Sequence, residues 1–147
     1  MTTQRPHVLF VCVKNGGKSQ MAAGLLRAIA GDTVDVSSAG TRPGGALNAQ
    51  SVDALLEVGV DIRDERPRAL EPALVAAADL VVVLGREAAV TTQDGTPVEV
   101  WDTDEPSERG IEGMERMRLV RDDIAARVQK LLERLTTGAA AGRHPGA

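Results

Sequence analysis

Short runs of aliphatic residues alternate along this chain with segments of helical periodicity. The clearest run is 79–84 (DLVVVL), and similar runs occupy 7–12 (HVLFVC) and 98–101 (VEVW). Short, valine-rich runs of this kind are typical of buried strands, because a helix normally needs ten or more residues. Residues 34–38 (VDVSS) indicate one more strand. Strands that alternate with helices favour an α/β layered fold with a largely parallel sheet.

The segments between these runs carry apolar residues three or four positions apart. They predict helices over 19–30, 48–58, 71–78 and 111–135. Ser19 and Asn48 stand at the starts of two of these helices and are expected to cap them. The 147 residues correspond to a single domain, which we assign to residues 1–136. The glycine- and alanine-rich residues 137–147 have no hydrophobic periodicity, so we expect them to form a disordered tail.

Charge, apolar run length and cysteine count exclude several classes of protein. The 17 basic and 21 acidic side chains leave a formal charge of −4, whereas nucleic-acid-binding surfaces carry clustered basic residues. The longest apolar runs fall far short of the roughly 20 residues that span a membrane. The single cysteine cannot form a disulfide within the chain and fits a reducing compartment. We therefore expect a cytoplasmic protein with no nucleic-acid or membrane partner.

The segment between the first strand and the first helix has the composition of an anion site. The start of a helix leaves about four backbone N–H groups unpaired and carries partial positive charge. Glycines let these groups converge, and lysines add charge, so a tetrahedral oxyanion is the expected guest. The oxyanion-binding residues predicted here are Val13, Lys14, Asn15, Gly16, Gly17, Lys18 and Ser19.

Cys12 directly precedes this segment and is the candidate nucleophile. The field that attracts an anion also favours the thiolate, which is the form of cysteine that attacks electrophiles. Ser19 can either donate a hydrogen bond to the sulfur or cap the helix, and Asn15 can tie the loop together. The alternative is that Cys12 is a small buried residue at the end of a strand. Two glycines and two lysines within the next six residues favour the anion site.

The end of the same segment also matches a nucleotide-binding loop. Gly17-Lys18-Ser19 fits the end of the pattern G-x-x-x-x-G-K-[ST], and Asp102 would then be the acid that binds magnesium. However, Cys12 stands where the first glycine of that pattern belongs. The chain is also small for a nucleotide hydrolase, so this interpretation is disfavoured.

The residues VLFVCVKNGGKSQMA, at 8–22, resemble the active-site loop of low-molecular-weight protein tyrosine phosphatases and of arsenate reductases with the same fold. They are most similar to the arsenate–mycothiol transferases. The similarity continues through Ser38–Thr41, Leu47-Asn48, Asp79–Gly85, Glu105-Pro106 and Gly113–Arg118. The resemblance thus spans about residues 7–135.

The resemblance implies a flavodoxin-like, three-layer sandwich with a four-stranded parallel sheet flanked by helices. It implies arsenate as the substrate, with phosphate and sulfate as analogues, and no bound cofactor. Mycothiol would be the co-substrate, and the arseno-mycothiol product would be reduced to arsenite by a separate mycoredoxin. Cys12 would either attack arsenic or stabilise the bound anion while mycothiol attacks.

Two positions depart from the wider family pattern. Lys18 stands where most members have arginine. The planar guanidinium of arginine is thereby replaced by the flexible, point-like charge of a lysine ammonium group. Glu105 precedes Pro106 where the phosphatases have an aspartate, and Asp104 stands beside it. Glu105 or Asp104 is expected to protonate the leaving oxygen, although a solvated acidic turn is the alternative. The expected catalytic residues are therefore Cys12, Lys18, Glu105 and Asp104.

The cysteine count bears on the reductant. Thioredoxin-coupled reductases of this fold use additional cysteines to resolve the adduct, and this chain has only Cys12, so the resemblance implies an external thiol. Two alternatives stay open: a phosphatase that forms a cysteinyl phosphate without any thiol, and a non-catalytic oxyanion-binding protein.

The remaining chemistry-bearing residues suggest structural roles. His7 and His144 lie in no cluster with the spacing of metal ligands, so we expect no metal site. Trp101 is expected in the core rather than in a pocket wall, and Arg42 is a weaker candidate for the anion site. Four arginines interleave with acidic residues, and most of them are expected to be solvated. These are Arg109, Arg116, Arg118 and Arg121.

Overall fold

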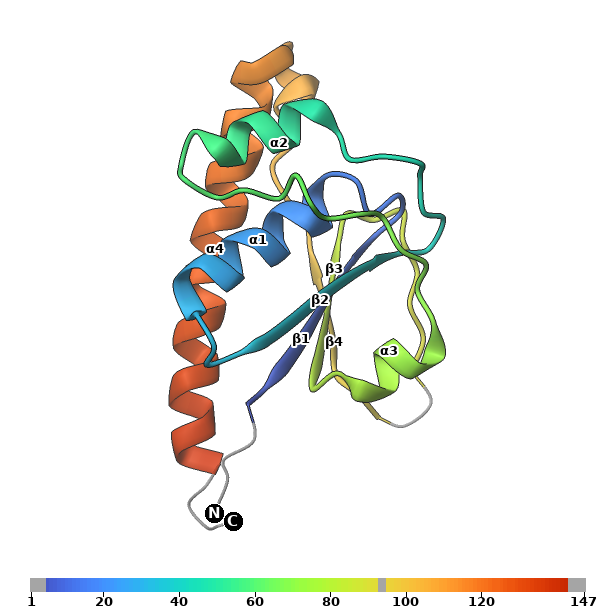
Figure 1. Ribbon diagram of the computed structural model, residues 1–147, viewed down its shortest axis with the longest axis vertical. Coiled ribbons are helices and arrows are strands. Elements are labelled where there is room, and N and C mark those ends of the chain that lie inside the picture. The colour runs from blue at the N-terminus through green and yellow to red at the C-terminus, as the bar shows by residue number, and fades with distance from the viewer. Residues whose placement is uncertain (1–4, 93–94, 143–147) are drawn as a thin grey trace.

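The computed structural model describes residues 5–92 and 95–142, and a four-stranded parallel sheet lies at its centre (Figure 1). The strands are β1 (His7–Cys12), β2 (Asp35–Gly40), β3 (Leu80–Leu84) and β4 (Val98–Trp101). Their order across the sheet is β2-β1-β3-β4, and every neighbouring pair is parallel. The predicted α/β fold with a parallel four-stranded sheet is confirmed.

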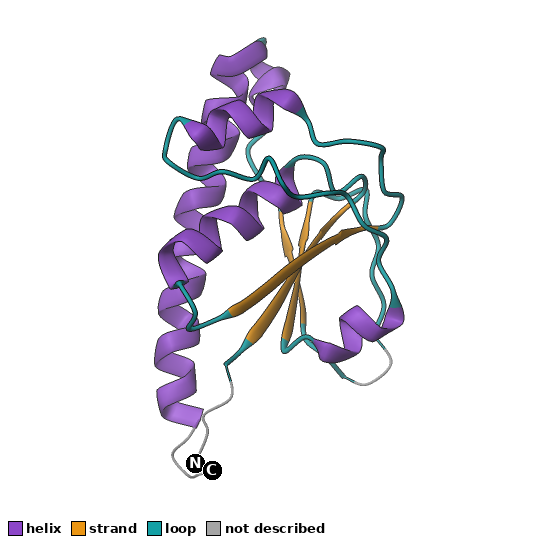
Figure 2. Ribbon diagram, viewed as in Figure 1, coloured by secondary structure: helices purple, strands orange, loops and turns teal. Residues whose placement is uncertain are grey.

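Helices on both faces complete three layers. They are α1 (Lys18–Ala30), α2 (Ala49–Leu56), α3 (Pro72–Ala77) and α4 (Gly113–Gly142), together with a short 3-10 helix, η1 (Pro106–Arg109). Helices α1 and α4 lie on one face of the sheet and α3 lies on the other (Figure 2). None of the helices in the described ranges is long and apolar enough to cross a membrane.

Two hydrophobic cores hold these layers together. The larger one joins the sheet to α1, α2 and α4, and in it the rings of Phe10 and Trp101 lie 5.8 Å apart. Trp101 is buried there, as expected. The smaller core lies on the other face, where Val75 of α3 packs near Val81 and Val83. Burial on both faces explains why β3 and residues 8–12 of β1 are apolar throughout rather than at alternate positions.

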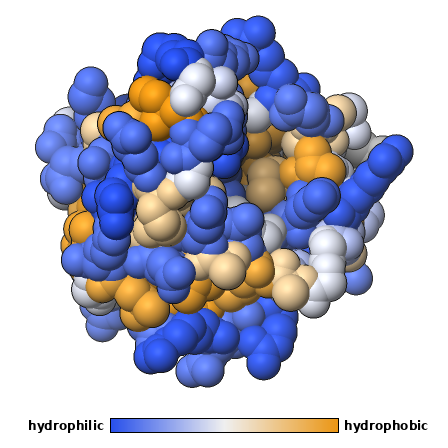
Figure 3. Space-filling view, turned by 90° about the horizontal axis from the view of Figure 1, so that it is seen from above, coloured by the Kyte–Doolittle hydropathy of each residue, from blue (hydrophilic) through white to orange (hydrophobic). Residues whose placement is uncertain are grey.

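The sheet order also sets where a ligand can bind. The chain passes from β1 to β2 on one side of β1, and later returns to β3 on its other side. The loops that follow β1 and β3 therefore diverge, which opens a crevice at the carboxyl ends of the strands. In the view from above, the surface is mostly hydrophilic, and hydrophobic residues form separate smaller patches (Figure 3).

The helix boundaries confirm one expected cap and correct the other. Asn48 caps α2, because its side-chain oxygen accepts a hydrogen bond from the backbone N–H of Ser51 at 2.9 Å. Helix α1 begins at Lys18 with Gly17 as its N-cap and without a side-chain cap. The expectation that Ser19 caps this helix is thus wrong, because its hydroxyl bonds to the neighbouring loop instead.

The end of the chain differs from the expected disordered tail over 137–147. Helix α4 continues to Gly142, well beyond the predicted end at residue 135. A helix that has already formed extends at little cost, and the run Ala139–Ala141 consists of the best helix former. Residues 143–147 lie outside the described part of the chain.

Candidate active site

Asn15 holds together the loop between β1 and α1. Its backbone has a φ of 55°, a left-handed conformation that asparagine tolerates better than most residues, and its side chain is buried. The side-chain oxygen accepts hydrogen bonds from Arg68 N at 3.0 Å and from Gln20 Nε2 at 3.2 Å. The side-chain nitrogen donates to Ser19 Oγ at 2.8 Å. The predicted role of Asn15 in tying the loop together agrees with these contacts.

The Cys12 sulfur lies at the start of this loop and receives two hydrogen-bond donors. Asn15 N lies 3.2 Å from the sulfur and Ser19 Oγ lies 2.9 Å from it. Ser19 already accepts a hydrogen bond from Asn15 Nδ2, so its own hydroxyl proton is available to the sulfur. Two hydrogen-bond donors thus converge on the sulfur of the predicted nucleophile.

The first turn of α1 supplies further donors beside this sulfur. Across the residues that the structure describes, the backbone N–H groups of Gly17, Lys18 and Ser19 have no protein acceptor. Unpaired N–H groups at the start of a 13-residue helix, with the positive end of its dipole, suit a tetrahedral anion. Lys14 is exposed beside the loop and adds positive charge.

The segment after β2 braces the loop from one side. Its backbone N–H groups, from Thr41, Arg42, Gly44 and Asn48, donate to carbonyls of Cys12, Val13, Lys14 and Gly16. A side chain at Gly40 would lie 2.6 Å from the Val13 carbonyl, so only glycine permits this approach. The Arg42 side chain is exposed, and this residue contributes through its backbone bond to Val13 O at 2.8 Å.

Lys18 connects the loop to the acidic turn after β4. Its Nζ lies 3.0 Å from Glu105 Oε2, and Arg116 Nη2 on α4 lies 3.3 Å from Glu105 Oε1. Burial raises the pKa of Glu105, but the bonds from Lys18 and Arg116 outweigh it and leave this pKa lowered. The carboxyl is therefore ionised at neutral pH while both cations are in place.

Arg116 was missed as a site residue, because interleaved charges suggested a solvated arginine. Its side chain is in fact only 28% exposed, and its Nε is buried without a partner among the described residues. The same expectation is wrong for Arg121, whose side chain is 11% exposed and donates to Ala54 O and Glu57. Charge spacing along α4 gives no sign of either contact, because both partners lie on other segments.

Asp104, the other candidate acid, faces a different partner. It accepts two hydrogen bonds from Arg109, at 2.8 and 3.2 Å, and this arginine lowers the pKa of Asp104. Of the two adjacent carboxylates, Glu105 alone is hydrogen-bonded to a residue of the anion loop.

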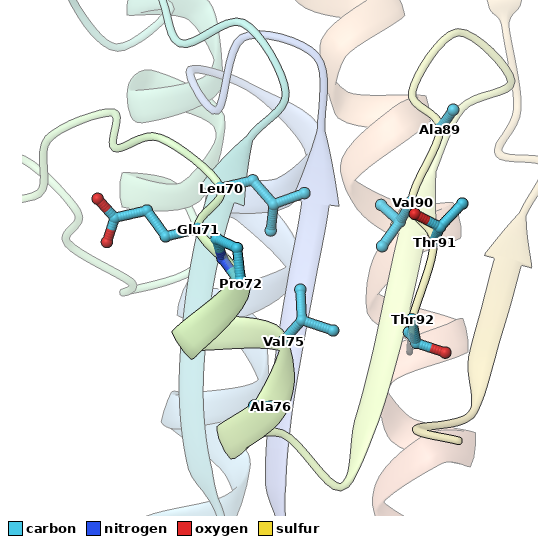
Figure 4. Close-up of a pocket in the computed structure, with 9 residues that line it drawn as sticks. All are labelled: Leu70, Glu71, Pro72, Val75, Ala76, Ala89, Val90, Thr91 and Thr92. Atoms are coloured by element: carbon cyan, nitrogen blue, oxygen red, sulfur yellow. The ribbon is translucent and has the colours of Figure 1, made fainter. Parts of the chain in front are cut away.

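A polar crevice of about 580 Å³ opens beside the anion loop, with Lys18 in its wall. Its other walls come from the loops after β3 and β4, including Arg86 and Glu87, two residues that the sequence analysis did not single out. A second cavity, of about 490 Å³, lies on the opposite side under α3 (Figure 4). Glu71, the charged residue of its lining, points away from the cavity, and no predicted site residue lines it.

His7, one of the two histidines considered as metal ligands, lies away from the anion loop. His7 Nε2 lies 2.7 Å from Ser37 Oγ, and His7 Nδ1 lies 3.1 Å from Ala77 O, at the start of β1 rather than at its Cys12 end. His144 lies outside the described residues. Throughout the described ranges, no three His, Cys, Asp or Glu side chains are grouped to hold a metal ion.

Comparison with known proteins identifies the family of this chain. The model of the low molecular weight phosphotyrosine protein phosphatases matches residues 7–140. The chain belongs to this family. An arsenate reductase from Bacillus licheniformis is 34% identical over 134 residues, which cover 86% of this chain and 94% of that protein.

Solved structures support the same placement of this phosphatase-family chain. A thioredoxin-dependent arsenate reductase from Corynebacterium glutamicum has a TM-score of 0.79 and 29% identity. The match covers 94% of this chain but 65% of that longer one. An arsenate reductase in its phosphate-binding state has a TM-score of 0.77 and 26% identity, over 88% of this chain and 98% of the other.

Proposed function

We propose that this member of the phosphatase family is an arsenate reductase that uses an external low-molecular-weight thiol, mycothiol, as co-substrate. The observation that carries the proposal is the Cys12 sulfur, held by Asn15 N and Ser19 Oγ at the start of an anion-binding helix. Arsenate has the tetrahedral shape and charge that such a helix start accommodates. Relatives named as arsenate reductases support the choice of substrate.

The chemistry begins with Cys12. Its thiolate attacks arsenic, one oxygen leaves as water after it takes up a proton, and a cysteinyl arsenate forms. The external thiol then attacks the same arsenic atom, so that the Cys12 thiolate is released and an arseno-thiol adduct leaves. Arsenic is still pentavalent at this point. A second thiol, for which we propose mycoredoxin, attacks the adduct sulfur to form a disulfide, and arsenite departs with the electron pair.

An external thiol is supported by the cysteine count. Reduction of arsenate to arsenite removes two electrons from thiols and yields one disulfide. This chain contains one cysteine, so it cannot form that disulfide within itself. Its Corynebacterium glutamicum relative is named as thioredoxin-dependent, so the identity of the reductant needs a direct comparison of thiols.

We propose that Glu105 supplies the proton. In the structure its carboxylate binds Lys18, which keeps its pKa low. When a doubly charged oxyanion draws Lys18 toward the loop, Glu105 keeps Arg116 as its cation partner but loses Lys18, so its pKa rises from the lowered value. The carboxyl can then take up a proton and deliver it to the leaving oxygen.

Thiol-dependent arsenite formation tests the function. The purified protein should release arsenite from arsenate when mycothiol and mycoredoxin are present, and release none when the thiol is withheld. Equal activity with thioredoxin alone would contradict the mycothiol assignment. Thiol-independent phosphate-ester hydrolysis without arsenite would identify a phosphatase, and saturable arsenate binding without turnover would identify a binding protein.

The two adjacent carboxylates form a matched pair for testing the acid. Glu105→Gln should lower kcat by about 10²-fold, the size of a general-acid contribution, without raising KM for arsenate, because Lys18 is freed for the anion. Asp104→Asn should change kcat by less than about threefold, because its partner Arg109 is an exposed surface residue. Steady-state kinetics at saturating thiol measure both. Equal losses in the two variants would contradict the assignment of Glu105.

A further inference from the structure

The two carboxylate oxygens of Glu105 bind cations from two different helices. Oε2 accepts a hydrogen bond from Lys18 Nζ at 3.0 Å, and Oε1 accepts one from Arg116 Nη2 at 3.3 Å. Lys18 belongs to the first turn of α1, where the anion is expected, whereas Arg116 belongs to the first turn of α4. An anion in the loop can therefore draw away one of these cations and leave the other in place.

The guanidinium of Arg116 has one hydrogen-bond donor left over. The Nε–H and one N–H of Nη2 lie on the same edge of an arginine, and this edge can bind a carboxylate with both donors. Arg63 binds Asp61 in this way, at 2.9 and 2.8 Å, and Arg118 binds Glu57 likewise. Arg116 uses only Nη2, and its Nε is buried without a partner in the described part of the chain. Because a buried donor without an acceptor costs free energy, a second bond to the same carboxylate would be favourable.

We propose that Arg116 is a positioning residue for proton delivery, which holds Oε1 of Glu105 and leaves Oε2 to exchange Lys18 for a proton. The proposal rests on the proposed arsenate reductase function, in which Glu105 is the acid. Oε2 is the oxygen bound to the lysine of the anion loop. A protonated carboxyl donates from one oxygen and accepts at the other, so an arginine on Oε1 keeps the proton on Oε2.

The proton transfer then proceeds in two stages. As arsenate draws Lys18 away, Oε2 takes up a proton from solvent, and Nε and Nη2 of Arg116 both donate to Oε1. Oε2 next gives this proton to the oxygen that leaves arsenic, while the Cys12 sulfur forms its bond to arsenic. The arsenic–oxygen bond breaks and its electron pair leaves with the oxygen, which departs as water. Glu105 is again a carboxylate, and no oxidation state has changed.

Arg116 also affects the acidity of this carboxyl. Burial raises the pKa of Glu105, whereas hydrogen bonds from Lys18 and Arg116 lower it. The neighbouring Asp104 is held by Arg109. The other charged residues around the crevice and on α4 beside it are Arg86, Glu87, Asp102, Glu108, Asp123 and Arg127. Once Lys18 has moved, Arg116 is the cation that stays bound to Glu105, so its removal should raise the pKa of this carboxyl further.

The pH dependence of kcat, at saturating arsenate and thiol, tests this role. Proton delivery needs the protonated carboxyl, so kcat should fall as the pH rises through the pKa of Glu105 in the substrate complex. Arg116→Gln should move this fall to higher pH by about one unit, because the carboxyl loses a cation. It should also lower the plateau of kcat by about tenfold, because the carboxyl is no longer held in place. Arg116→Lys should restore the position of the fall but not the plateau, since lysine keeps the charge and lacks two donors on one edge.

Arg118→Gln is the matched control for loss of charge. It removes a cation two positions further along α4, where the arginine pairs with Glu57 rather than with Glu105, and should change neither the plateau nor the pH profile. A loss of kcat in Arg116→Gln without any shift of the profile would show a merely structural role and overturn the proposal.

A measurement without turnover separates this role from the proposed function. In the Cys12→Ser protein saturated with inorganic phosphate, the Glu105 carboxyl is titrated by carbon NMR, with Glu105→Gln to assign its signal. Arg116→Gln should raise the pKa of this carboxyl. An unchanged pKa overturns the proposal whether or not the enzyme forms arsenite. A raised pKa in a protein that forms no arsenite with any thiol supports the hold of Arg116 on Glu105 and removes only the arsenate reductase function.

Discussion

Replacement of Cys12 by serine is expected to lower arsenate turnover by about 10⁴-fold or more while anion binding persists. The sulfur is the proposed nucleophile, and a serine hydroxyl is far less ionised than a thiol. The anion is held mainly by backbone N–H groups of the first turn of α1 and by Lys18, which the substitution leaves in place. Arsenite release by the mycothiol-coupled assay and arsenate binding by calorimetry measure the two effects.

The control for this variant is Ser19→Ala, which removes one donor to the sulfur but keeps the thiol. A loss of about 10- to 100-fold in kcat is expected, because one hydrogen bond to a developing or formed charge contributes on that scale. Full activity of Cys12→Ser would contradict the mechanism. A variant that neither turns over nor binds arsenate would instead indicate that the loop has collapsed.

Replacement of Asn15 by alanine is expected to cause the largest loss of stability, about 3 kcal/mol in the free energy of unfolding. Arg68 N loses its acceptor in a part-buried hydrogen bond, and an orphaned group of this kind costs about 1–3 kcal/mol. The Gln20 amide loses one of its three acceptors, and Ser19 Oγ loses a donor. Alanine also fits the left-handed backbone at this position poorly. Urea denaturation, with the midpoint and slope compared between variants, measures the effect.

Two further variants separate the causes. Asn15→Gly removes the same hydrogen bonds but accepts a φ of 55°, so it should be about 1 kcal/mol less damaging than alanine. Asn15→Asp keeps an acceptor oxygen and should be the most stable of the three, but its charge beside Cys12 should weaken arsenate binding. Equal stability of the alanine variant and the wild type would show that the side chain does not hold the loop.

Much of the fold could be predicted from local sequence alone. The four strands and the helix positions follow from runs and spacings of apolar side chains, and apart from the end of α4 the structure places them within a few residues. The α4 end was mispredicted, because the sequence of residues 137–142 lacks the periodicity that tertiary packing requires but retains helix propensity. The anion loop was equally visible, since Cys12, two glycines and two lysines lie within seven consecutive residues.

The contacts between side chains across the site could not be predicted from local sequence and were found only in the tertiary structure. Lys18 and Glu105 are 87 positions apart, and Arg116 reaches Glu105 from a different element. The role of Ser19 could not be predicted from local sequence either. Its position suits a helix cap, but its hydroxyl forms hydrogen bonds with Cys12 and Asn15. Local patterns determine which segments become strands, helices and an anion loop. Which side chains then meet depends on how the sheet order brings distant loops together, and no local spacing encodes that.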